Sequence, residues 1–294
     1  MFDAAPGETR TQRGGTGLQP NDSRMSGPPA RVDAVTLEAR AAALFGRAVR
    51  GAALEAARRL TVACLDLTTL EGTDTPETVR SLCVRGRASG VAAVCVYPAL
   101  VAAAVESLRS SGVRVAAVAG AFPSGHSTLS VKLADLRSAL DAGADEVDVV
   151  LDRGAFLAGR YGEVSAQLEA LRAESAGATL KVIVEAGELG SYAALRRACD
   201  LALAAGADFI KTATGKIATS TTPAIALAMC DAIRAHRRAT GRSAGLKLAG
   251  GIRNARTAFG YLAIVKESLG DEWLQPARLR FGASRLLEEL AATA

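Results

Sequence analysis

The sequence predicts an α/β protein, namely a (β/α)8 TIM barrel with an extra N-terminal helix and a disordered N-terminal tail. Short apolar runs alternate with longer stretches of helical pattern through to the C-terminus, which is typical of this barrel. The chain has 294 residues, 49% of them hydrophobic, so it can bury one large core. A doubly wound open sheet is the structural alternative, but the turn after the first run lacks a glycine-rich phosphate fingerprint.

The N-terminal part of the chain divides into a tail and a helix. Residues 1–31 are rich in proline and glycine and poor in large apolar residues, which predicts disorder. A helical pattern begins at Val32, with Thr36 as the expected N-cap and Leu44 on the apolar face. We expect residues 32–294 to form one TIM-barrel domain.

Eight apolar runs are the expected strands of the barrel. Helix-length stretches separate them, and Thr75-Pro76 marks the start of one, because threonine is a favoured N-cap and proline is favoured at the first helical position. The expected strands are Thr61–Leu67, Val91–Tyr97, Arg114–Ala119, Glu146–Leu151, Thr179–Glu185, Asp208–Ala213, Gly245–Ala249 and Leu279–Gly282.

Composition excludes several classes of protein. Charges interrupt every apolar run before it reaches the ~18 residues of a membrane span. The net charge of +5 comes mainly from arginines scattered along helices, which indicates a solvated surface and suits a small anionic substrate. No basic cluster is interleaved with aromatic residues, so nucleic acid is not an expected partner. The five cysteines and two histidines show no metal-ligand spacing, which predicts reduced thiols in a cytoplasmic protein without a metal site.

Charged residues interrupt five of the expected strands. Strands of a parallel barrel are buried on both faces and should be nearly all apolar. Side chains alternate along a strand, and apolar neighbours such as Ile210 and Leu246 should take the side facing the helices. We therefore expect five charged residues to point into the barrel: Asp66, Asp148, Lys181, Lys211 and Lys247. The structural alternative is an ion-pair network that only fills the barrel centre.

Two lysines held close together have a specific chemical use. A lysine amine is a nucleophile only when neutral, and both desolvation and a neighbouring ammonium group disfavour its protonated form. Such an amine can attack a carbonyl group to form a Schiff base, while a nearby carboxylate moves protons. The pattern therefore predicts a class I aldolase, which needs neither a metal nor an organic cofactor.

Three glycine-containing loops after the last strands predict a phosphate site. They are Thr214-Gly215-Lys216, Gly250-Gly251-Ile252-Arg253 and Gly282-Ala283-Ser284. Barrels often bind phosphate with the loops after their final strands. Each glycine alone is an ordinary turn residue, so the prediction depends on finding all three loops in the expected places.

Six stretches resemble the deoxyribose-phosphate aldolase family, in order and across residues 60–288. They are Leu65–Leu70, Cys95–Pro98, Asp145–Val150, Phe209–Lys216, Lys247–Arg253 and Arg280–Ser284. The strand-six stretch with its two lysines is the most specific of them. Leu248 stands where the family usually has a proline, from which we expect only a small change in loop rigidity.

The resemblance implies reversible retro-aldol cleavage of 2-deoxy-D-ribose 5-phosphate to D-glyceraldehyde 3-phosphate and acetaldehyde. It implies that Lys211 forms the Schiff base and that Lys247 lowers the pKa of Lys211 and transfers protons. Asp148 would be the acid/base working through a water, and Asp66 would order the site. The implied substrate pocket contains Lys216, Gly215, Gly250, Gly251, Gly282 and Ser284, with Lys181 in support and Cys95 nearby but not needed for cleavage. No cofactor is implied, and a cytoplasmic homodimer is expected.

Two other functions remain open at this point. One is a different Schiff-base barrel enzyme, with the same chemistry and another sugar phosphate. A screen of donors separates the two, because acetaldehyde should react and dihydroxyacetone phosphate should not. The other is a non-catalytic sugar-phosphate sensor, which would keep the phosphate loops but need not keep Lys211, Lys247 and Asp148 together.

Overall fold

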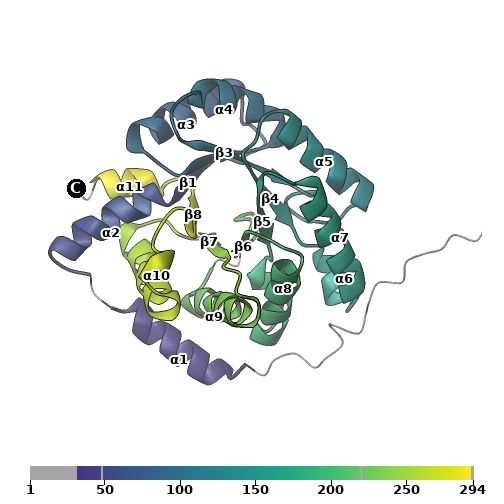
Figure 1. The fold of residues 1–294 in the computed structure, drawn as a ribbon. Coiled ribbons are helices and arrows are strands. Elements are labelled where there is room, and N and C mark those ends of the chain that lie inside the picture. The colour runs from purple at the N-terminus through teal and green to yellow at the C-terminus, as the bar shows by residue number, and fades with distance from the viewer. Residues whose placement is uncertain (1–31, 48, 219–220, 293–294) are drawn as a thin grey trace, which may run out of the picture.

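The computed structural model describes residues 32–47, 49–218 and 221–292, and it contains a closed barrel of eight parallel strands (Figure 1). Each strand pairs with the next in the chain, and β8 closes the barrel by pairing with β1. The strands are β1 (Leu65–Thr68), β2 (Ala93–Val96), β3 (Arg114–Ala119), β4 (Glu146–Val150), β5 (Thr179–Ile183), β6 (Phe209–Lys211), β7 (Gly245–Ala249) and β8 (Leu279–Ala283). The predicted TIM barrel is confirmed.

Helices surround the barrel on its outer face (Figure 1). The described helices are α1 (Ala34–Phe45), α2 (Ala52–Ala63), α3 (Pro76–Ser89), α4 (Val101–Leu108), α5 (Leu129–Asp141), α6 (Arg153–Leu157), α7 (Tyr161–Glu174), α8 (Tyr192–Ala204), α9 (Pro223–Thr240), α10 (Ala255–Leu269) and α11 (Leu286–Ala292). The predicted start of α3 is confirmed, because Thr75 caps it and Pro76 is its first residue. Within the described residues, no helix is long and apolar enough to cross a membrane.

The N-terminal region differs from the prediction. It forms two helices, α1 and α2, where one was expected, and α1 packs on the outside of α9 and α10 (Figure 1). The N-cap is Asp33 and not Thr36, because the Asp33 carboxylate accepts hydrogen bonds from the backbone N–H of Val35 and Thr36. Leu44 is buried against the other helices as expected. The predicted tail, residues 1–31, lies outside the described residues.

Strand boundaries move at two informative places. Residues 61–63 were expected in the first strand but complete α2, where the Thr61 hydroxyl donates to the carbonyl of Ala57 one turn earlier. Glu185 was expected in the fifth strand, which ends at Ile183; its backbone has φ 51°, a left-handed conformation that no strand accommodates. The other expected ends shift by at most two residues.

Two apolar clusters position the site. The large one fills the space between strands and helices and contains most of the buried residues. The small one lies on the opposite face of β2 and β3, inside the barrel, and is made of Leu70, Ala93, Cys95, Ala116 and Val118. Beside it, several buried charged side chains occupy the barrel interior. All five cysteines are free and buried.

Candidate active site

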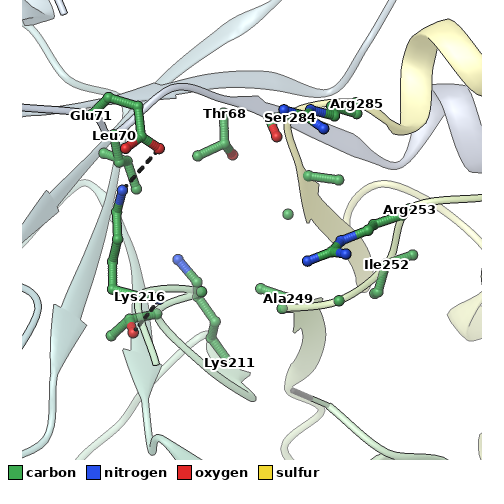
Figure 2. Close-up of a pocket in the computed structure, with 16 residues that line it drawn as sticks. Thr68, Leu70, Glu71, Lys211, Lys216, Ala249, Ile252, Arg253, Ser284 and Arg285 are labelled. Atoms are coloured by element: carbon green, nitrogen blue, oxygen red, sulfur yellow. Dashed lines mark hydrogen bonds and ion pairs between the residues drawn. The ribbon is translucent and has the colours of Figure 1, made fainter. Parts of the chain in front are cut away.

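A cavity of about 370 Å³ opens at the carboxyl ends of the strands, where barrel enzymes place their chemistry. Lys211 of β6 points into it from below, between Lys216 and Arg253 (Figure 2). The predicted pocket residues that line it are Lys211, Gly215, Lys216, Gly250, Gly251, Gly282 and Ser284. The three predicted phosphate loops therefore meet around one space.

The glycines of this pocket have two different physical roles. Gly250 and Gly251 have φ of 90° and 78°, so the turn after β7 requires residues that tolerate positive φ. Gly282 instead makes room, since a Cβ there would lie 3.2 Å from Cε of Lys247. The stem of Lys247 passes through the space that a larger residue at position 282 would fill.

Lys211 and Lys247 share one carboxylate oxygen. Nζ of Lys211 lies 2.8 Å from Oδ2 of Asp148, and Nζ of Lys247 lies 2.7 Å from the same oxygen. Lys211 and Lys247 are also register partners on neighbouring strands. Lys211 is 3% exposed, and Lys247 and Asp148 are fully buried. The two amines are therefore held together beneath the pocket, and only Lys211 lines it.

Asp66 and Lys181 complete the group below Lys211. Lys247 donates to Oδ2 of Asp66 as well as to Asp148. Nζ of Lys181 lies 2.8 Å from Oδ1 of Asp148, on the side away from Lys211. All five charged residues expected inside the barrel are thus in contact with one another. Lys181 and Cys95 do not line the pocket and lie in the interior beneath it.

The two lysines have pKa shifts in opposite directions. Burial lowers the pKa of Lys211, and although Asp148 opposes this, the charge of Lys247 lowers it further. Burial also acts to lower the pKa of Lys247, but the two carboxylates of Asp148 and Asp66 outweigh it and raise that pKa. Lys211 is therefore the amine that loses its proton more readily, and Lys247 remains a cation beside it.

The aspartates remain ionised despite their burial. Burial alone would raise the pKa of Asp148, but Lys181, Lys211 and Lys247 hold it well below its usual range. Burial opposes ionisation of Asp66 in the same way, while Lys247 and Arg280 lower its pKa. Among the described residues, no group of His, Cys, Asp and Glu is arranged to hold a metal ion.

Comparison with known families identifies the chain. A sequence model of the family described as DeoC/LacD family aldolase matches residues 60–272. The chain belongs to the DeoC/LacD family of aldolases. It is 40% identical to deoxyribose-phosphate aldolase from Homo sapiens over 247 residues, covering 78% of each chain. It is 41% identical to the Mus musculus protein of the same name over 247 residues, with 78% of each chain covered.

A solved structure gives a comparable result. The deoxyribose phosphate aldolase from Aeropyrum pernix, described as having a unique tetrameric structure, matches with a TM-score of 0.65 at 25% identity. The match covers 89% of this chain and 98% of that one. This DeoC/LacD aldolase is accordingly a carbon–carbon lyase of class I.

Two charged residues inside the aldolase barrel were missed from the sequence. Glu146 lies two residues before Asp148 on β4, and Arg280 lies two residues before Gly282 on β8. Both are buried in the barrel interior, where they contact each other and the group below Lys211. The same alternation that pointed to Asp148 would have found both, because residues two apart on a strand share a face.

The aldolase pocket also contains side chains that the sequence did not assign. Thr68 of β1 lines it, together with Arg253, Arg285 and Glu71. Nζ of Lys216 lies 2.9 Å from Oε1 of Glu71, so this cation is paired with a carboxylate (Figure 2). Arg253 and Arg285 lie across the cavity from this pair (Figure 2).

Glu185 anchors the loop that carries Gly215 and Lys216. Its buried carboxylate accepts hydrogen bonds from the backbone N–H and the hydroxyl of Thr214, and Arg153 lies 3.0 Å away. The Thr214 hydroxyl in turn accepts from the backbone N–H of Lys216. The Glu185 carboxylate thus holds one wall of the aldolase pocket in place.

Proposed function

We propose that this chain is a 2-deoxy-D-ribose-5-phosphate aldolase that cleaves its substrate to D-glyceraldehyde 3-phosphate and acetaldehyde through a Schiff base on Lys211. The observation that carries the proposal is the pair of lysines on one oxygen of Asp148, with only Lys211 lining the pocket. The identity to the curated deoxyribose-phosphate aldolases supports the substrate.

The pocket has the polarity that this substrate requires. The glycine-rich turns, Ser284 and the cations Lys216, Arg253 and Arg285 all line the cavity, and such groups bind phosphate by hydrogen bonds and charge. Lys211 enters the same cavity from below and is the reactive amine that lines it (Figure 2). We therefore place the 5-phosphate among the loops and the C1 aldehyde of the open-chain sugar at Lys211.

The reaction then follows the ordinary steps of a class I aldolase. The neutral amine of Lys211 attacks C1, and loss of water gives an iminium ion. Removal of the proton from the C3 hydroxyl breaks the C2–C3 bond, whose electron pair passes to the iminium and leaves an enamine on Lys211. Glyceraldehyde 3-phosphate departs with C3 as its aldehyde carbon. Protonation of the enamine at C2 and hydrolysis of the imine release acetaldehyde and restore the amine.

Asp148 and Lys247 are the groups that we assign to the proton transfers. They are an ionised pair 2.7 Å apart beside Lys211, so one accepts and the other donates without a change in the net charge of the site. Asp66 holds Lys247 from its other side. A cytoplasmic location and a homodimeric assembly complete the proposal.

Trapping with borohydride tests the proposal directly. The protein is incubated with 2-deoxyribose 5-phosphate and borohydride, and release of glyceraldehyde 3-phosphate is followed in a parallel coupled assay. We expect turnover, and a reduced N-ethyl adduct on Lys211 by peptide mass spectrometry. Lys181 and Lys247 are internal controls, because they lie in the same network but do not line the pocket. A label on either of them, or none at all, would reject the assignment.

A further inference from the structure

A layer of charge lies beneath the reactive lysines, at the end of the barrel away from the pocket. The guanidinium of Arg280 binds both oxygens of Glu146, with Nη2 2.7 Å from Oε1 and Nη1 3.0 Å from Oε2. Nη1 of Arg280 also lies 2.6 Å from Oδ1 of Asp66. Arg280 comes from β8 and Glu146 from β4, so these contacts cross the barrel.

This layer is connected to Lys211 by two routes. Asp66 presents Oδ1 to Arg280 and Oδ2 to Lys247. Nζ of Lys181 lies 2.6 Å from Oε2 of Glu146 and 2.8 Å from Oδ1 of Asp148. Arg280 therefore acts on the reactive lysines through Asp66, and Glu146 acts on them through Lys181 and Asp148.

The charges of this buried network do not balance when every group is ionised. The described network has three carboxylates, Asp66, Glu146 and Asp148, and four basic side chains, Lys181, Lys211, Lys247 and Arg280. An unbalanced buried charge is costly, so the network favours one neutral base. Arginine does not deprotonate in proteins. Lys211 is the base that gives up its proton at the lowest cost, because it shares its one carboxylate oxygen with Lys247.

We propose that Arg280 and Glu146 are positioning residues that set the protonation state of Lys211 from below. The positive charge of Arg280 favours the neutral amine of Lys211, and the negative charge of Glu146 favours its protonated form. The proposal rests on the proposed function, since it takes Lys211 as the nucleophile. Neither residue lines the pocket, so neither touches substrate. Their effect on the reaction is electrostatic and passes through the groups between them and Lys211.

Other titratable and charged groups also face the network. Lys211 faces Asp148 of β4, Lys247 of β7 and the thiol of Cys95 of β2, and burial raises the pKa of that thiol. Above the floor, the charged groups of the pocket are Lys216, Arg253, Arg285 and Glu71. Glu146 also lies 3.7 Å from Arg114 of β3, which is 56% exposed, so solvent screens that charge.

The test measures kcat/KM for 2-deoxyribose 5-phosphate against pH in the wild type, Arg280→Gln and Glu146→Gln. The acidic limb of this pH profile, where activity falls as pH falls, reports the protonation of Lys211. Arg280→Gln removes a positive charge, so the limb should move to higher pH. Glu146→Gln removes a negative charge, so it should move to lower pH. We expect shifts of about one pH unit each, the size of a buried charge acting over a few side chains. In the double variant the acidic limb should lie close to its wild-type pH, because the two charge changes cancel.

Arg114 provides a matched control for this experiment. Arg114→Gln removes an exposed arginine from the same Glu146 and should leave the limb in place. Where Arg280→Gln does not fold, Glu146→Gln and the double variant still test the sign. If the acidic limb stays in place in both single variants, or moves in the same direction in both, the inference is overturned and Arg280 and Glu146 have a structural role only. Absence of turnover or of a Lys211 adduct in the wild type rejects the proposed function instead.

Discussion

The two reactive lysines show how identical side chains acquire different properties from their carboxylate partners. Lys247 lies between Asp66 and Asp148, and its pKa is raised although burial opposes this. Lys211 has only the shared oxygen of Asp148, and burial together with Lys247 lowers its pKa. Position within the network therefore decides which amine becomes neutral and which remains charged.

Replacing Lys247 tests this division of roles. Lys247→Leu removes the like charge beside Lys211 and a group that moves protons, so activity at pH 7 should fall by about 10² to 10⁴-fold. The measurement is kcat/KM for release of glyceraldehyde 3-phosphate from folded protein. Lys132→Leu is the matched control, because Lys132 is a fully buried lysine bound to Asp152, and it does not line the pocket. It should lower stability and preserve turnover, whereas near wild-type turnover in Lys247→Leu would contradict the assignment.

Glu71 gives a second prediction at the scale of one residue. Its carboxylate pairs with Lys216, and a negative charge there should repel a phosphate group. Glu71→Gln should lower KM for 2-deoxyribose 5-phosphate by about two- to fivefold, the range expected for an exposed ion pair, and leave kcat unchanged. KM for unphosphorylated 2-deoxyribose should not change. Glu77→Gln, which removes an exposed carboxylate paired with Arg80 on α3, is the control. An equal effect on both sugars would show that Glu71 does not act on the phosphate.

At the scale of elements, the sequence predicted the order and type of the strands better than their ends. Thr61, Val62 and Ala63 form a run that suits a strand locally, but α2 continues through them and packs against α10 and α11. Glu185 follows an apolar strand without any turn signal, and its left-handed backbone is set by hydrogen bonds from the distant Thr214. Both errors arose because contacts between distant parts of the chain override local preference.

The floor of the barrel depends on a glycine in β7. Gly245 is the register partner of Phe209 on β6, and a Cβ at Gly245 would lie 2.3 Å from the Phe209 ring. Gly245→Ala should therefore lower the free energy of unfolding by about 1–3 kcal/mol, the usual cost of overpacking a core. Urea unfolding measures this. Gly72→Ala, at a position with open space around it, should change stability by less than about 0.5 kcal/mol. Equal stability of the two variants would mean that Phe209 moves aside freely.

At the scale of the whole molecule, the site is a property of barrel closure. Asp66 and Arg280, which touch, lie on β1 and β8 at opposite ends of the chain. Alternation along each strand predicted which side chains point inward, but the contacts across the barrel depend on how the strands are staggered. Alternation alone would have shown that Glu146 and Arg280 point inward, but only the folded barrel shows that they contact each other from β4 and β8. Glu71 and Arg285 were missed because they lie on loops, where no periodic pattern applies.

The same network predicts how the whole molecule responds to acid. The pKa values of Asp66 and Asp148 are lowered in the fold because their basic neighbours outweigh burial, whereas an unfolded aspartate titrates near about 3.9. Folded aspartates with depressed pKa stabilise the protein above that pH, and this stabilisation is lost as pH falls towards the folded pKa. Glu185 acts in the opposite direction, because burial raises its pKa, so its contribution to stability increases slightly as pH falls.

The expected result is a free energy of unfolding that falls steeply below about pH 4, by up to about 1.4 kcal/mol per pH unit for each aspartate. A smaller loss is expected between pH 7 and 5, because burial lowers the pKa of His236 in the fold. Urea unfolding at a series of pH values measures this slope. Because the network is buried, the slope should persist in high salt, where exposed ion pairs are screened. A slope below pH 4 that high salt abolishes would place the acid-sensitive charges on the surface instead of inside the barrel.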